Sequence, residues 1–424
     1  MKIKKFVVTG LMLVGLQGIT DQGQAATSEA SSDAVSRSPR PQVLVLLQAA
    51  QVHQQQKKPE LALKKLAEID AIPDLTEWER YLQARTTIDI IKFNSDTEAM
   101  IKALLVIRPM PYLPPQEAVL FDQILAGSYL KTGQYARLID TMSADIQAGR
   151  HPELLGFLAF AYFLSGDFKH AALVQRDFIN SAAATATPAD AGAWLLLANA
   201  CNKINDSNCY LESLEKALEL EYSDVVMQSL LIRLGNNGNH VDRLQVEIYR
   251  LGQQFKPLRT SELIDFIRLL LLNGAPAEAT TLVETAFKSG ALGKGEDAPR
   301  HERLRALVAK EYARATTQPE LILKHYKTGR QSDKIVELGY DLVHAGSTPK
   351  GIELIESAIA SGEIKDMGVA KLHLGLAYAM AGRNEEAAAQ LSSIPGDENL
   401  ARLGRLWAIQ NKQSALAKPR KPAS

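Results

Sequence analysis

The two cysteines are the residues of this 424-residue chain whose spacing points most directly to a reaction. Cys201 and Cys209 lie eight positions apart, and a close pair in an oxidising compartment can form a disulfide. If Cys201 ends one helix and Cys209 begins its antiparallel partner across a turn at Asn205, their Cα atoms fall within about 4.4–6.8 Å. Two separately packed thiols are the alternative, and the sequence leaves both open.

Patterns for catalysis, cofactors or metals are missing from the sequence. The eight histidines are scattered, and no HExxH, paired CxxC, GxSxG or Walker-type loop occurs. The glycine-rich stretch Gly290–Gly295 lacks the spacing and the Ser/Thr of a phosphate cradle, so we interpret it as a solvated loop. We interpret His170 and His301 as surface or packing residues. The sequence therefore predicts no catalytic, cofactor-binding or metal-binding residue and no enzyme.

The elements that would position any site are helices. Apolar residues recur at three- and four-residue steps, the pattern of amphipathic helices. Prolines that begin a second helix cost no hydrogen bond, because the first helical N–H has no partner; they are Pro59, Pro276, Pro319 and Pro349. Turn glycines precede these helices at Gly133, Gly166, Gly238, Gly274, Gly346 and Gly382. Gly133 and Gly166 lie 33 residues apart, and Gly238 and Gly274, like Gly346 and Gly382, lie 36 apart. This spacing is typical of a helical solenoid.

Residues aligned on these glycines share a packing logic. A small residue lies seven positions before the glycine, an aromatic or leucine lies four before it, and a small residue lies five after it, as in Gly375, Tyr378 and Ala387 around Gly382. Small residues let two helices approach closely, and the aromatic fills space beside the turn. The pattern resembles the tetratricopeptide repeat, W-x2-L-G-x2-Y followed by A-x3-F. A second copy begins at Trp194 and departs from the pattern at Cys201 and Tyr210.

The resemblance implies an all-α fold, a right-handed superhelix of antiparallel helix pairs, rather than an irregular helical bundle. We expect about ten hairpins in residues 43–395, a capping helix in 396–412 that covers the last repeat, and a disordered basic tail in 413–424. Residues 76–108 and 300–328 fit the repeat only loosely.

The N-terminus predicts export. Lys2, Lys4 and Lys5 precede an apolar stretch at 6–19, and small residues follow at 23–26. The stretch is shorter than the roughly 20 residues needed to span a bilayer. We therefore expect a signal peptide in 1–26 and a flexible Ser/Pro-rich leader in 27–42, with an uncleaved anchor as the alternative. The mature chain is expected in the periplasm, without a membrane span.

The charge balance argues against nucleic acid. Lys and Arg number 48, as do Asp and Glu, so the formal net charge is zero. A duplex binder normally carries a positive excess that neutralises phosphates. We expect a protein or peptide partner instead, and the oligomeric state is left open.

The predicted binding surface is the concave face formed by the first helices of successive hairpins. Aromatic anchors and asparagines suit an extended peptide or a partner helix. The residues we expect in this groove are Phe160, Phe163, Asn199, Asn202, Lys203, Arg268, Tyr340, His344 and Met380. For Phe160 and Phe163, packing against the neighbouring repeat is the alternative.

These observations favour a periplasmic scaffold or adaptor in an envelope complex. The stretch from Gly351 to Trp407 is loosely similar to the ends of exported repeat proteins, some of which accompany TonB-type systems. A scaffold for polysaccharide export or peptidoglycan remodelling is the second hypothesis. A periplasmic enzyme is the third, and it would require a cluster of titratable groups converging on a pocket.

Overall fold

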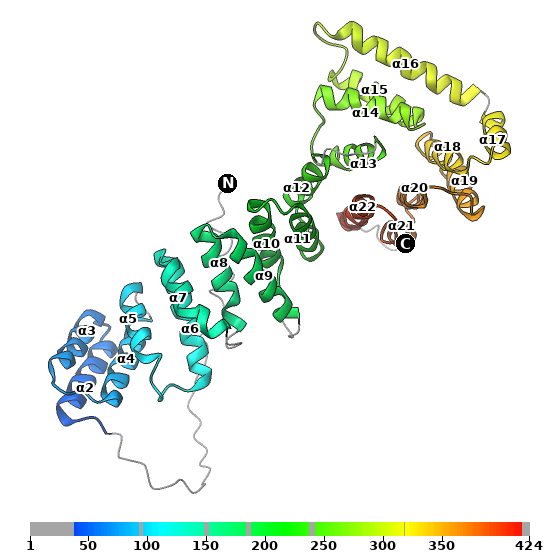
Figure 1. Ribbon diagram of the computed structural model, residues 1–424. Coiled ribbons are helices and arrows are strands. Elements are labelled where there is room, and N and C mark those ends of the chain that lie inside the picture. The colour runs from blue at the N-terminus through cyan, green and yellow to red at the C-terminus, as the bar shows by residue number, and fades with distance from the viewer. Residues whose placement is uncertain are drawn as a thin grey trace, which may run out of the picture. The chain divides into compact units, whose positions relative to one another are not determined.

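The computed structural model describes residues 38–92, 96–147, 152–183, 188–236, 242–317 and 319–417 (Figure 1). The described residues form helices joined by short connections, and none of them lies in a strand, which confirms the all-α prediction. Helices α2 to α21 follow one another as ten consecutive pairs. The chain divides into two compact units, unit 1 ending at Ser213 and unit 2 beginning at Leu214.

Unit 1 is an array in which each helix packs against its neighbours in sequence. Short 3₁₀ helices, Glu68–Ala71 and Pro152–Leu154, lie beside α3 and before α8. The helices of unit 1 are α2 (Pro41–Gln55), α3 (Pro59–Ala67), α4 (Glu77–Ile91), α5 (Thr97–Ile107), α6 (Pro115–Thr132), α7 (Tyr135–Gln147), α8 (Leu155–Ser165), α9 (Phe168–Ala183), α10 (Ala191–Lys203) and the first half of α11 (Ser207–Leu220).

The turns of unit 1 follow the expected chemistry. Gly133 and Gly166 end α6 and α8 in the left-handed region, with φ of 74° and 88°, where a residue with a Cβ is disfavoured. Asn205 takes the same role after α10 with φ of 59°, since asparagine tolerates this region better than most residues. Each reversal lets the next helix pack back antiparallel to the first.

The core of unit 1 is continuous along the array. Buried clusters follow one another from α2 to α11, and neighbouring clusters meet at shared side chains, Leu82 and Tyr162. Tyr129, the aromatic that the repeat pattern places before Gly133, is fully buried. No hairpin covers its apolar side alone, so the stability of each repeat depends on its neighbours.

Unit 2 begins in the second half of α11. Its helices are α12 (Asp224–Gly235), α13 (Asp242–Gly252), α14 (Thr260–Leu272), α15 (Pro276–Ser289), α16 (Ala298–Thr317), α17 (Pro319–Thr328), α18 (Ser332–His344), α19 (Thr348–Ala360), α20 (Met367–Met380), α21 (Asn384–Leu391) and α22 (Glu398–Ala417).

Unit 2 departs from a simple series of stacked pairs. Helix α15 contacts α18 directly, and α13 contacts α22, although many residues separate them in sequence (Figure 1). The expected capping helix, α22, covers α20 and α21 and also reaches back to the beginning of the unit. Arg402 Nε donates to Glu215 Oε2 at 3.0 Å, and Tyr222 Oη donates to Gln410 Oε1 at 2.6 Å. The last helix of unit 2 is therefore fastened to its first.

The ends of the chain differ in part from the expected boundaries. Helix α2 begins at Pro41, inside the segment predicted as a leader, because proline suits a first helical position. Helix α22 continues to Ala417, past residue 412, since alanine and leucine favour helix there. The predicted signal peptide, residues 27–37 and residues 418–424 lie outside the described residues.

Helices α18 and α19 approach each other closely at two glycines, Gly339 and Gly351. A Cβ added to Gly339 would lie 2.8 Å from both Gly351 O and Ile355 Cγ1. Neither neighbour can move without separating the two helices. These two positions are the small residues that the repeat pattern places at the crossing.

We predict that Gly339→Ala lowers the free energy of unfolding by about 1–3 kcal/mol, because the added methyl overpacks the α18–α19 contact. Gly252→Ala is the matched control, since a Cβ at Gly252 meets no atom within 4 Å. Urea unfolding of the two variants measures the difference. If the two variants were equally stable, the methyl group at position 339 would not overpack the α18–α19 contact, and the prediction would be wrong.

Candidate functional site

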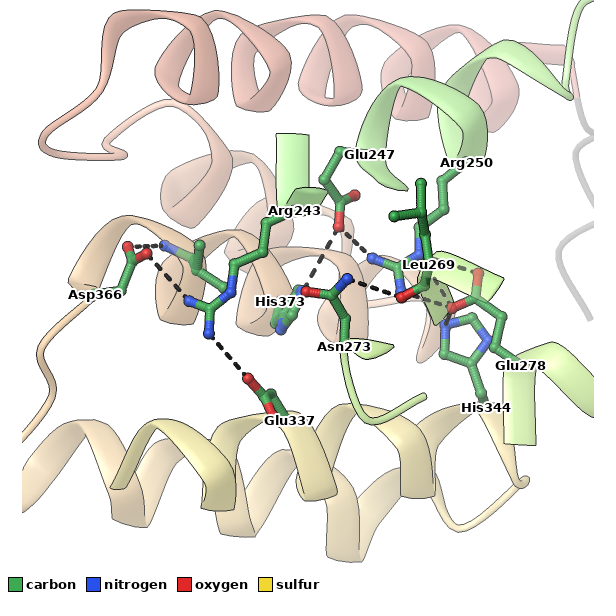
Figure 2. Close-up of polar contacts among 11 residues, drawn as sticks. Arg243, Glu247, Arg250, Leu269, Asn273, Glu278, Glu337, His344, Asp366 and His373 are labelled. Atoms are coloured by element: carbon green, nitrogen blue, oxygen red, sulfur yellow. Dashed lines mark hydrogen bonds and ion pairs between the residues drawn. The ribbon is translucent and has the colours of Figure 1, made fainter. Parts of the chain in front are cut away.

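The candidate site of unit 2 is a buried cluster of charged and aromatic side chains around Arg250. Helix α13 carries three charged residues on successive turns, Arg243, Glu247 and Arg250, which point toward α15, α18 and α20 (Figure 2). Glu278 lies on α15, Glu337, Tyr340, Asp341 and His344 lie on α18, and His373 lies on α20. We call these residues, together with Asp366, the Arg250 cluster.

Arg250 holds the centre of the cluster. Its guanidinium donates to both oxygens of Glu278, from Nε to Oε1 at 3.0 Å and from Nη2 to Oε2 at 2.6 Å, and Nη1 donates to Glu247. All three side chains are buried, with exposed fractions below a tenth. One buried cation is thus shared by two buried carboxylates from two helices.

Aromatic rings form the wall of the cluster. Tyr340 stacks on His373 with ring centroids 4.3 Å apart and planes 7° from parallel, and it meets His344 edge-on. The Arg250 guanidinium lies 5.0 Å from the Tyr340 ring centroid, a cation–π distance. His373 Nε2 and His344 Nε2 each lie 3.6 Å from a glutamate oxygen, of Glu247 and Glu278 respectively.

This arrangement corrects two predicted groove residues. We expected Tyr340 and His344 on an open concave face, but Tyr340 is only 3 % exposed and His344 is largely buried. The repeat pattern placed them correctly on a first helix, α18. Helix α13 covers that face, so both residues serve the interior of unit 2.

The protonation states follow from burial and charge together. Burial opposes ionisation of Glu247, but Arg250 and His373 outweigh it and lower the pKa of the carboxyl. Burial also opposes the charge on Arg250, and its two glutamates raise the guanidinium pKa well above its usual value. Burial lowers the pKa of His344. The centre therefore carries Glu247 as an anion and Arg250 as a cation.

The pKa of Asp341 shifts in the opposite direction from that of Glu247. Asp341 Oδ1 accepts a hydrogen bond from the backbone N–H of Ala277 at 2.8 Å, so this residue of α18 caps the N-terminus of α15. Burial nevertheless raises the pKa of its carboxyl from 3.8 to about 7, and the hydrogen bonds from the Ala277 and Glu278 backbone only partly offset this.

Two more exposed ion pairs, both made by Arg243, extend the cluster. Arg243 Nη2 donates to Glu337 at 3.1 Å and Nη1 donates to Asp366 at 3.3 Å, which joins α13 to α18 and to the beginning of α20 (Figure 2). Asp366 also accepts from the backbone N–H of Val369 and so caps α20. One side chain of α13 therefore fixes the positions of two later repeats.

The cluster encloses little space. The cavity between Arg243, Glu247, Tyr340 and His373 measures about 20 Å³, close to the volume that one water molecule requires. Glu247 Oε2 and His373 Nδ1 are buried there without a hydrogen-bond partner in the described part of the chain. The geometry suits a structural junction of four helices.

The predicted groove residues of unit 1 lie on the neighbouring first helices α8 and α10. Phe160 and Phe163 are half-buried on α8, and Phe163 packs edge-on against Phe168 of α9, in the same hairpin, with ring centroids 5.4 Å apart. On α10, Asn199 is half-buried, and Asn202 and Lys203 are exposed.

Arg268 and Met380, the remaining predicted groove residues, are exposed and belong to unit 2. Arg268 lies on α14 with its guanidinium 3.9 Å from Asp265, and Met380 ends α20. Neither contacts the Arg250 cluster in the described contacts of unit 2.

Cys201 and Cys209 form a disulfide in the structure, with their Cα atoms 5.8 Å apart. The bond crosses the turn at Asn205 and joins the end of α10 to the beginning of α11. It lies in the buried cluster that ends unit 1. The bridged alternative of the sequence analysis thus has suitable geometry.

Comparison with known proteins gives weak likenesses to repeat proteins. No protein-family model and no curated protein matches the chain. The structure is similar to the Naa15/Naa10 complex bound to HypK-THB, with 14 % identity, a TM-score of 0.38, and 90 % of this chain and 69 % of that chain covered.

Two further likenesses are to solved tetratricopeptide structures. The C-terminal part of a TPR repeat-containing protein from Cytophaga hutchinsonii is 12 % identical, with 66 % of this chain and 98 % of that chain covered and a TM-score of 0.29. The TPR domain of P58(IPK) is 13 % identical, with 89 % and 99 % covered and a TM-score of 0.20. The description of the chain as tetratricopeptide-like rests on its own hairpins, glycine turns and close crossings.

Among the helices between residues 38 and 417 that the structure describes, none combines the length and the apolar character required to cross a bilayer.

We predict that Arg250→Met lowers the stability of unit 2 by about 3–5 kcal/mol, because it leaves Glu247 and Glu278 buried without their cation. Hydrogen exchange followed by mass spectrometry measures the loss, as faster exchange in α13, α15, α18 and α20. Arg268→Met is the matched control, since that arginine is exposed. Exchange in α13 as slow as in the control would contradict the central role of Arg250.

We predict that Asp341→Asn removes part of the pH dependence of stability. With its pKa raised from 3.8 to about 7, the folded chain binds a proton that the unfolded chain releases, so Asp341 contributes most at acid pH and loses that contribution as pH rises to about 7. Asparagine keeps an oxygen for the Ala277 amide and does not titrate. Urea unfolding between pH 4 and 7 should show wild type losing stability relative to the variant; parallel curves would refute this.

Proposed function

We propose that the protein is an exported scaffold that holds an apolar peptide or helix of an envelope protein on the α8–α10 face of unit 1. The observation that carries this proposal is the composition of α8. Its eleven residues, LGFLAFAYFLS, contain no charged side chain. A helix that is apolar on all sides is normally buried on all sides.

Helix α8 is buried on only part of its surface. Leu155, Leu158, Ala159 and Ala161 face the core, but Phe157, Phe160 and Phe163 are half-buried and Leu164 is 40 % exposed. Phe157 and Phe163 pack against the buried clusters on either side, and Phe160 belongs to neither of these clusters among the described residues. An apolar strip left facing solvent between polar neighbours is typical of a protein interaction site.

Helix α10 supplies the polar edge of the same face. Asn202 and Lys203 end the helix in exposed positions, and Lys203 Nζ lies 5.7 Å from the Phe168 ring centroid. A partner with apolar anchors on one side and an acidic residue beside them would match both α8 and Lys203. Such a helix or extended segment can bury aromatic side chains at its centre while charges remain at the rim.

Export is supported by the sequence. The basic start, the short apolar stretch and the small residues before Thr27 are the features of a cleaved signal peptide. The close cysteine pair, which has disulfide geometry, suits an oxidising compartment such as the bacterial periplasm. Together they support placing the scaffold among envelope complexes.

We predict that a photo-crosslinking amino acid at position 160 captures a protein partner in intact cells that carry the full-length gene. The same amino acid at position 173 is the control, because Leu173 is exposed on α9, the second helix of the same hairpin. Mass spectrometry identifies the adduct and the N-terminus of the mature chain, which is expected at Ala26 or Thr27.

The captured partner is then tested for dependence on the apolar strip. Phe160→Ala combined with Leu164→Ala should weaken its binding at least tenfold, since buried anchors dominate such interfaces; Leu173→Ala should leave it unchanged. Adducts formed equally from position 173 would refute the binding face. A chain that keeps Met1 and remains in the cytoplasm would refute export.

A further inference from the structure

A second cavity lies in unit 1, between α9, α10 and α11. Its volume is about 220 Å³, and it is lined by Arg176, Ile179 and Asn180 of α9, Trp194 and Leu197 of α10, and Cys209, Glu212 and Ser213 of α11. Pockets for drug-sized ligands measure about 300–1,000 Å³. The cavity is thus large enough for one amino-acid residue and too small for a folded segment.

The floor of the cavity is apolar. Ile179, Leu197 and Cys209 are buried, and the half-buried Trp194 packs against the same cluster. The disulfide to Cys201 fixes Cys209 in this floor. A branched or aromatic side chain of a ligand would find apolar contacts on several sides there.

The rim carries opposite charges on two different helices. Arg176 Nη2 of α9 lies 3.5 Å from Asp206 Oδ2, a long distance for an ion pair, and both side chains are substantially exposed. The Arg176 guanidinium is therefore only weakly held by Asp206. Glu212 of α11 and the amide of Asn180 are exposed and make no hydrogen bond or ion pair within the described residues. A guanidinium binds a carboxylate in two-pronged fashion, and a carboxylate binds an ammonium group.

This cavity is separate from the proposed partner-binding face. Leu197 lines the cavity, whereas Asn199, one of the predicted groove residues of α10, does not. Two residues of an α-helix that are two positions apart point about 200° apart around its axis. A ligand in the cavity and a partner on α8 would therefore occupy opposite sides of α10.

From the apolar floor and the two rim charges, we propose that this cavity binds a free zwitterionic amino acid with an apolar side chain. The ligand carboxylate lies against Arg176, its ammonium group lies against Glu212, and its side chain enters beside Trp194. The size of leucine or phenylalanine fits the volume, whereas a residue inside a polypeptide would offer neither charge.

Isothermal titration of the purified full-length chain with L-leucine and L-phenylalanine tests the proposal. Two probes each lack one half of the ligand: glycine has both charges without an apolar side chain, and N-acetyl-leucinamide has the side chain without either charge. We expect leucine or phenylalanine to bind, and both probes to bind at least tenfold more weakly. No binding of either amino acid, or equal binding of N-acetyl-leucinamide, would overturn the assignment.

Two variants locate the site. Arg176→Met and Glu212→Gln should each weaken binding at least tenfold, whereas Arg268→Met should not change it. Both rim side chains are exposed, so thermal unfolding of the variants should match wild type. The chain has three tryptophans, and the double variant Trp78→Phe, Trp407→Phe keeps only Trp194. The fluorescence of Trp194 should change when leucine is added. Unchanged emission, or wild-type affinity in both charge variants, would overturn the site.

Discussion

The burial of one guanidinium between two carboxylates is the constraint on which unit 2 depends. Arg250, Glu247 and Glu278 are each almost fully removed from water, so none of them can be left unpaired without a large desolvation cost. Because the two glutamates lie on α13 and α15, satisfying Arg250 brings these helices together. His344 and His373 then bring α18 and α20 to the same centre.

The cluster determines arrangement more than it adds net stability. A buried ion pair often contributes no more than well-packed apolar residues of the same volume would. The cluster fixes geometry, because the planar guanidinium donates hydrogen bonds only in a limited set of directions. Apolar contacts between helical hairpins tolerate small changes of register, whereas the bonds of Arg243 and Arg250 do not. The connection of α22 to Glu215 fastens the same unit at another point.

The sequence predicted the parts of the fold that depend on local chemistry. The turn at Gly166 requires a left-handed backbone, and Pro276 begins α15, so both were readable from spacing alone. The burial of Tyr340 was not readable from spacing, because α13, the helix that covers this residue, lies about ninety residues earlier in the chain. Glu247 and Arg250, three positions apart, have the spacing of an ordinary pair on a helix surface. Only the packing of α13 reveals that they are buried.

The same position in the repeat therefore differs between the two units, being buried on α18 and partly exposed on α8. The first-helix face of α18 is covered by α13, whose charges match the polar groups that it meets. The corresponding face of α8 has no charged side chain, so an ionic junction of the Arg250 kind cannot form there, and its phenylalanines stay partly open. A face that has no polar groups to satisfy can accept an apolar partner from outside without leaving a buried charge unpaired, which is the physical reason for proposing that a partner binds unit 1.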